Sequence, residues 1–143
     1  MAEIGLLIMF ETKFAIALRD DLAQWQKLNV TAFLATGIAG QRPEIIGEPY
    51  RDAAGNVYNA LSIQPIIVLS ADAATLSNIQ RRALERNIRI SLYVDGMFST
   101  GHDRANREVF SRSGPDEAAI AGIAIHAERK LVDKITKGAK LHG

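Results

Sequence analysis

Two short polar clusters carry the residue types in this sequence that could do chemistry. Arg19-Asp20-Asp21 follows the apolar run at 14–18, and Asp95-Gly96 follows the apolar run at 89–94. Two carboxylates beside an arginine can orient water, hold a divalent ion or form an ion pair that only stabilises the fold. Aspartate is also a common strand terminator and helix cap. Both roles stay open, and the structural one is the more frequent.

The segments around these clusters predict an α/β domain. Strand-like apolar runs at 14–18, 65–70, 89–94 and 122–126 alternate with helical patterns at 28–39, 72–86, 103–112 and 128–137. This alternation is typical of a single-layer mixed β-sheet, here of four to five strands, with helices on both faces. Ligands of open α/β sheets bind beyond the carboxyl ends of strands, so the two clusters converge if their strands run parallel.

The domain boundaries follow from the same patterns. We predict one domain over residues 9–143, with residues 1–8 as an N-terminal extension. Residues 44–63 predict an inserted irregular hairpin, because two strand-like stretches flank the turn signal Gly55-Asn56.

Composition narrows the function classes. The chain is 48% hydrophobic and 23% charged and contains no cysteine, which excludes disulfides, thiolate nucleophiles and cysteine-bound metals. The net charge of +1 divides into −3 for residues 1–72 and +4 for residues 73–143, which permits a basic face without showing one. We expect a cytoplasmic protein that spans no membrane and uses no metal or cofactor.

Other motifs carry weaker signals. Gly96–Gly101 has the glycine spacing of a phosphate loop but lacks its Lys-Ser/Thr, so we reject a nucleotide site there. His102, beside Asp103, is the one histidine that we would test as a general base. Trp25, the only tryptophan, either stacks on a base or, more frequently, packs a loop onto the core.

Four stretches of the sequence resemble the second class of peptidyl-tRNA hydrolases, the archaeal and eukaryotic type. Glu11–Leu22 is similar to that family's opening, a lysine, an apolar strand and then Arg-x-Asp-Leu. Gln64–Val68 resembles its second core strand, Leu92–Gly96 the strand that delivers an aspartate, and Leu131–Leu141 the closing helix and tail. The resemblance covers most of residues 11–141 in order and implies the hydrolase fold.

The functional motif of that family is altered here. Asn29 stands near the family's lysine, and Phe33 and Thr36 stand near its glutamine and histidine. Gly-Met-Phe-Ser-Thr follows Asp95 where the family has Ala-Gly-Arg-Thr, and the compact hydrolases lack the hairpin at 44–63. The pattern resembles the uncharacterised sister family of these hydrolases, which shares their fold and has no established activity.

The residues and the resemblance together give a set of candidate site residues and two hypotheses for the function. The candidate catalytic residues are Asp21, Asp95 and Asn29, and the candidate substrate-binding residues are Lys13, Arg19, Thr36, Ser99, Thr100 and His102. The first hypothesis is hydrolysis of an ester such as peptidyl-tRNA. The second is a non-catalytic binding module for a small molecule or protein in the same cleft. Whether the chain is an enzyme is open, with tRNA or a small molecule as the expected ligand and a homodimer as the expected assembly.

Overall fold

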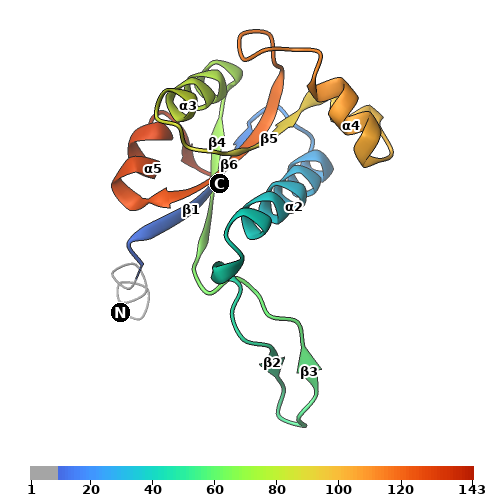
Figure 1. Cartoon of the computed structure of the whole chain (residues 1–143), viewed down its shortest axis with the longest axis vertical. Helices are drawn as coiled ribbons and strands as arrows, with labels where there is room; N and C mark the ends of the chain where they lie inside the picture. The colour runs from blue at the N-terminus through green and yellow to red at the C-terminus, as the bar shows by residue number, and fades with distance from the viewer. Residues whose placement is uncertain (1–9) are drawn as a thin grey trace.

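The two longest strands form the centre of the sheet in the computed structural model, which describes residues 10–143 (Figure 1). The predicted extension at 1–8 lies outside the described residues. The elements are β1 (Thr12–Arg19), α2 (Gln24–Gln41), η1 (Pro43–Ile45), β2 (Tyr50–Arg51), β3 (Val57–Tyr58), β4 (Ile66–Ala71), α3 (Ala73–Glu85), β5 (Ser91–Val94), η2 (Asp95–Ser99), α4 (Asp103–Phe110), β6 (Ile120–Glu128), α5 (Arg129–Ile135) and β7 (Lys140–Leu141), where η marks a 3₁₀ turn.

The main sheet has five strands in the order β5-β6-β1-β4-β7. Strands β1 and β4 are parallel, and every other neighbouring pair is antiparallel. The predicted mixed sheet is therefore confirmed. The sequence also predicts burial on both faces for residues 65–70, but β4 is only partly buried. Burial on both faces belongs instead to the centre of β1 and to β6, as their near-continuous apolar runs require.

Helices cover both faces of the sheet, as predicted. Alternate residues of β1 point to opposite faces, so Ala15 and Ala17 pack in the core with α3 and α5. Phe14, Ile16 and Leu18 pack in the other core, with α2. Figure 1 shows α2 on one side of the sheet and α3 and α5 on the other. No described helix is long and apolar enough to cross a membrane.

Helix α2 is longer than the sequence pattern predicts. It begins at Gln24, four residues before the predicted start, and the Gln26 side chain accepts a hydrogen bond from the Ala23 amide there. It continues through Gly37, where the helix passes so close to β5 that a Cβ would lie 2.3 Å from Ser91 Oγ. Pro43 follows the last residue of α2 by two positions and starts η1.

The predicted hairpin is present and projects away from the body of the molecule (Figure 1). We call residues 46–63 the arm. Its turn is organised by Asp52, whose carboxylate accepts hydrogen bonds from the Ala54 and Asn56 amides, the Asn56 side chain and the Tyr58 hydroxyl. Hydrogen bonds from the Asn56 side chain and the Tyr58 hydroxyl lower the pKa of Asp52 to about 2. The turn is thus held by an ionised carboxylate at neutral pH.

A buried polar pair joins β6 to the start of β4. His126 and Gln64 are each 6% exposed, and His126 Nε2 lies 2.9 Å from Gln64 Oε1. Gln64 Nε2 donates to the Thr12 carbonyl, so its oxygen faces the histidine, which donates through Nε2. Burial lowers the pKa of His126, and the positive charge of Arg42 lowers it further. The ring is therefore neutral at pH 7, and its Nδ1 has no hydrogen-bond partner in the described part of the chain.

This pair predicts a pH dependence of stability. The pKa of His126 in the folded chain lies below its ordinary value of 6.5, so the unfolded chain takes up the proton first as the pH falls. The free energy of unfolding should therefore decrease from about pH 6.5 downward. The variant His126→Gln keeps a side chain that can bond Gln64 but does not titrate. Urea unfolding at about pH 7.5 and about pH 5.5 should show the wild type losing more stability than the variant. Parallel losses would contradict the assignment to His126.

Candidate functional site

Arg19 brings the two polar clusters together. Strands β1 and β5 both run antiparallel to β6, so their carboxyl ends lie at the same edge of the sheet. Arg19 Nη1 lies 2.8 Å from Asp95 Oδ1, and Arg19 Nε lies 2.6 Å from Asp21 Oδ1. Nη1 also donates to the Ile120 carbonyl at 2.9 Å. The predicted convergence is confirmed, and β6 contributes a backbone acceptor between the strands.

The three charged residues form a graded cluster, which we call the ion-pair cluster. The Arg19 side chain is 14% exposed, that of Asp95 43% and that of Asp21 68%. Burial lowers the pKa of Arg19, but its hydrogen bonds and charge interactions with Asp95 and Asp21 outweigh this and raise the pKa above its ordinary value. Each carboxylate uses only Oδ1 on the arginine. The Oδ2 atoms therefore stay available to a water molecule or a ligand.

A pocket lined by aromatic rings opens beside this cluster, between α2, β5, η2 and the start of α4. It has a volume of about 270 Å³. Its rings form a continuous series, with centroids 5.8 Å apart for Trp25 and Phe98, 5.0 Å for Phe98 and Tyr93, and 5.9 Å for Tyr93 and Phe33. We call it the aromatic pocket. Its full lining is Trp25, Asn29, Phe33, Tyr93, Met97, Phe98, Thr100, Gly101, His102, Asp103 and Asn106.

Polar groups enter the aromatic pocket from two sides. Asn29, on α2, has no hydrogen-bond partner for its side chain among the described residues, so both its amide groups are available. His102 caps α4, because its Nδ1 accepts from the Ala105 amide. The neutral ring then carries its proton on Nε2 and acts as a donor. Thr100 and Asn106 bond each other side chain to side chain.

The structure separates the predicted site residues into groups. Asn29, Thr100 and His102 line the aromatic pocket. Arg19, Asp21 and Asp95 form the ion-pair cluster, and Asp95 borders a different cavity, of about 400 Å³, on the α3 face. Thr36 and Ser99 are exposed and line neither cavity, and the Thr36 hydroxyl donates to the Phe33 carbonyl.

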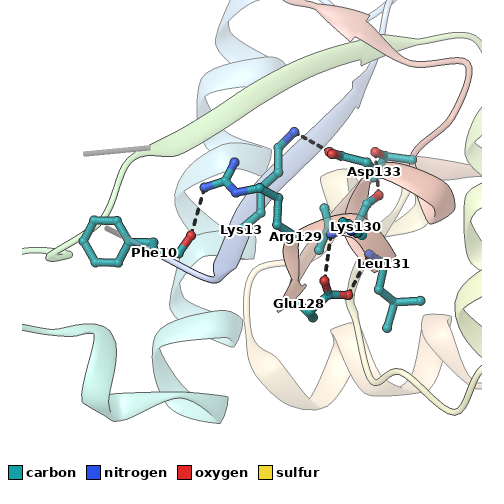
Figure 2. Close-up of polar contacts among 9 residues, drawn as sticks. Phe10, Lys13, Glu128, Arg129, Lys130, Leu131 and Asp133 are labelled. Atoms are coloured by element: carbon teal, nitrogen blue, oxygen red, sulfur yellow. Dashed lines mark hydrogen bonds and ion pairs between the residues drawn. The ribbon is translucent and has the colours of Figure 1, made fainter. Parts of the chain in front are cut away.

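Lys13 does not reach the site. It lies near the other end of β1, six residues from Arg19, which corresponds to about 20 Å along a strand. Its Nζ instead forms an ion pair with Oδ1 of Asp133, on α5, at 2.6 Å (Figure 2). Figure 2 also shows Glu128 accepting from the Lys130 and Leu131 amides and so capping that helix. Lys13 is therefore not part of the Arg19 cluster, and its substrate-binding role stays a prediction that the structure does not test.

Sequence reasoning missed the aromatic series. Of the two roles left open for Trp25, the packing of a loop onto the core does not match the structure, because Trp25 lies in the first turn of α2 and is 61% exposed. Trp25, Asn29 and Phe33 recur every fourth residue and so share one face of a helix. That signal depends on the helix beginning at Gln24, and the absence of a Ser, Thr, Asp or Asn cap at Ala23 concealed the start.

The described residues do not provide a ligand set of the kind that holds a metal ion in proteins. They contain no group of three or more histidine, aspartate or glutamate side chains placed to hold a metal ion. What the site offers is an ion-paired carboxylate pair and an aromatic pocket with free polar groups.

Comparison with known proteins identifies a family whose function is not known. Residues 12–143 match the family described as "Protein of unknown function (DUF2000)". A solved structure, that of the protein of unknown function Atu0240 from Agrobacterium tumefaciens str. C58, is 65% identical over 94% of this chain and 100% of that chain, with a TM-score of 0.93. No curated protein matches the chain. These descriptions assign no reaction or ligand, so the resemblance to peptidyl-tRNA hydrolases stays a prediction.

The graded exposure of the ion-pair cluster predicts unequal stability effects. Asp95→Asn should lower the free energy of unfolding by about 1–2 kcal/mol, because it weakens a partly buried bond to Arg19, and Asp21→Asn by under about 1 kcal/mol. Double-mutant cycles with Arg19→Met, followed by urea unfolding, measure each coupling. Asp20→Asn is the matched control, since Asp20 is exposed and not bonded to Arg19. Equal couplings for Asp95 and Asp21 would contradict the gradient.

Proposed function

The chain belongs to the DUF2000 family of proteins of unknown function, and we propose that it binds a small molecule in the aromatic pocket. The small molecule carries a flat aromatic ring, and it is bound without chemical turnover. The observation that carries the proposal is the exposure of the rings. Trp25 is 61% exposed and Phe33 is 51% exposed, although they are the two ends of a continuous aromatic series. Large exposed apolar surface next to a pocket is typical of ligand sites.

The polar groups of the aromatic pocket suit the edge of such a ring. The free amide of Asn29 can donate and accept, as needed for the heteroatoms of a nucleobase-like ring, and His102 Nε2 donates from the opposite wall. Aromatic side chains can stack on the face of any nucleobase-like ring, whatever its substituents. A ring stacked on Trp25 or Phe33 would lie within reach of these polar groups.

The same groups give little support for catalysis inside the pocket. Burial raises the pKa of Tyr93, which keeps its hydroxyl protonated at neutral pH. The Nδ1 lone pair of His102 accepts the hydrogen bond of the Ala105 amide and so serves as the cap of α4. A general base needs a free lone pair near the substrate. The pocket is therefore better built to hold a ligand than to transform it.

Binding can be followed through the single tryptophan. Titration with adenosine, guanosine, cytidine and uridine should change the fluorescence of Trp25 in a saturable way for at least one of them, since Trp25 lines the pocket. Phe33→Ala should weaken that binding about tenfold or more, because it removes a stacking surface. Phe110→Ala, an exposed phenylalanine on α4 outside the pocket, is the matched control and should leave the affinity unchanged. No saturable response to any probe, or equal effects of the two variants, would refute the proposal.

Ester hydrolysis is the second candidate, and it rests on a different observation. Asp95 and Asp21 converge on Arg19 at the edge where the resemblance implies a hydrolase site, and each keeps a free Oδ2. A carboxylate held in this way can orient a water molecule, and the arginine beside it can stabilise developing negative charge. Asn29 lies across the aromatic pocket, where it could hold part of the substrate.

Hydrolysis has its own test, independent of the ring-binding assay. If the ion-pair cluster is catalytic, the chain cleaves a peptidyl-tRNA mimic, and Asp95→Ala and Asp21→Ala each lower the rate about 100-fold or more. Asp20→Ala should leave the rate unchanged. Product formation is measured directly, so cleavage would overturn the non-catalytic proposal. Absence of cleavage, or cleavage unaffected by these variants, would remove the hydrolase candidate.

A further inference from the structure

The arm has an apolar surface that no other part of the chain covers within residues 10–143. Its exposed large apolar residues, each 41–60% exposed, are Ile46, Tyr50, Val57, Tyr58, Leu61 and Ile63. The β2–β3 ladder that carries them is only two residue pairs long, joined nearer the body by one bridge between Ile46 and Ser62. An isolated two-stranded hairpin is marginally stable in water. The arm thus combines a weak internal scaffold with a large apolar surface.

The shape of the arm is nevertheless fixed. Asp52 accepts four hydrogen bonds at the turn, and Gly55 supplies the positive φ of 87° that the turn needs. At the base, the Gly47 amide donates to the Leu61 carbonyl and the Ile63 amide donates to the Ile45 carbonyl. A segment that is ordered at both ends while exposing its apolar side chains is preorganised for association.

A groove beside β4 matches the arm. It lies between α2 and β4, has a volume of about 770 Å³ and includes Leu28, Ile66 and Val68 in its lining. Strand β7 pairs only with Leu69 and Ser70, and the His142 amide reaches the Val68 carbonyl. The β4 edge at Ile66 and Ile67 therefore has no strand beside it among the described residues. Open edges and apolar grooves of this kind accept added β-strands.

The position of the groove next to the arm favours the arm of a second copy of the chain as the segment that binds in it. The arm leads directly into β4 through Gln64 and Pro65, so arm and groove adjoin within each copy. Two copies related by a two-fold axis near this junction could each place the arm in the other's groove, which gives a closed, self-complementary interface. We propose that the protein is a dimer formed by this reciprocal exchange of arms.

The exposed area is sufficient for such a dimer. Leu28 is 65% exposed and Ile66 is 40% exposed, which adds two apolar side chains of the groove to the six of the arm. At roughly 100 Å² each, these eight side chains, which lie on both faces of the arm and in the groove, present at most about 800 Å² per copy, close to the amount that one partner of a standard stable interface buries. The arm also spans about 25 Å from base to tip, long enough to cross a groove of this size.

The first experiment measures assembly by sedimentation velocity over a dilution series of the whole chain. The wild type should be a dimer. Val57→Asp in the arm and Leu28→Asp in the groove should each raise the dissociation constant at least tenfold, because each places a charge in an apolar contact. Leu84→Asp, at a residue 52% exposed on α3, is the matched control and should leave the dimer intact. A monomeric wild type would overturn the proposal, whatever else binds the arm.

The second experiment separates arm exchange from other dimers. In a mixed dimer of a Val57→Asp chain and a Leu28→Asp chain, the unchanged arm of the second chain can enter the unchanged groove of the first. The mixture should therefore dimerise more strongly than either variant alone. Thermal unfolding of each variant checks that the body of the molecule is intact. If Leu28→Asp has no effect while Val57→Asp dissociates the dimer, the arms pair with each other and the groove is not involved. That result, or a mixture no stronger than its components, would overturn the exchange.

Discussion

The close approach of α2 to the sheet positions the aromatic pocket of the candidate site. A Cβ at Gly122, near the start of β6, would lie 2.7 Å from Val30 Cγ1 and 3.2 Å from the Ala17 carbonyl oxygen, so only glycine admits the helix at this distance. Gly37 does the same where α2 passes β5. These two contacts fix the rotation of the helix. They therefore determine that Trp25, Asn29 and Phe33 face Tyr93 and Phe98 across a pocket.

The ion-pair cluster depends on the same sheet through its backbone. Arg19 is the last residue of β1 and reaches over the start of β6 to Asp95, while the Asp95 amide donates to the Ala119 carbonyl. Strand register, not local sequence, therefore brings the two clusters within ion-pair distance. The register shift between Tyr93 and Val94 lies immediately before Asp95 and aims it toward Arg19.

Much of the fold could be predicted because its signals are local. Apolar runs of strand length, the helical pattern at 72–86 and the turn at Gly55 each depend on residues close together in the sequence, and the structure confirms them. The site was harder to predict because it depends on where α2 begins, and Ala23 gives no capping signal. The length of the first strand is enough to predict that Lys13 and Arg19 lie at opposite ends of β1. The family resemblance nevertheless groups Lys13 with Arg19, because it places both in one motif.

Helix α2 also explains why one small domain could carry two separate interaction sites. Its buried side is made by Val30, Leu34 and Ile38, yet Leu28 and Phe33 leave apolar side chains exposed on its flanks. A helix that is apolar beyond its core-facing stripe usually contacts something on its other sides. One flank borders the aromatic pocket and the other borders the groove, with the buried stripe between them. A ligand and a second copy of the chain could thus be held by the same helix without competing for the same side chains.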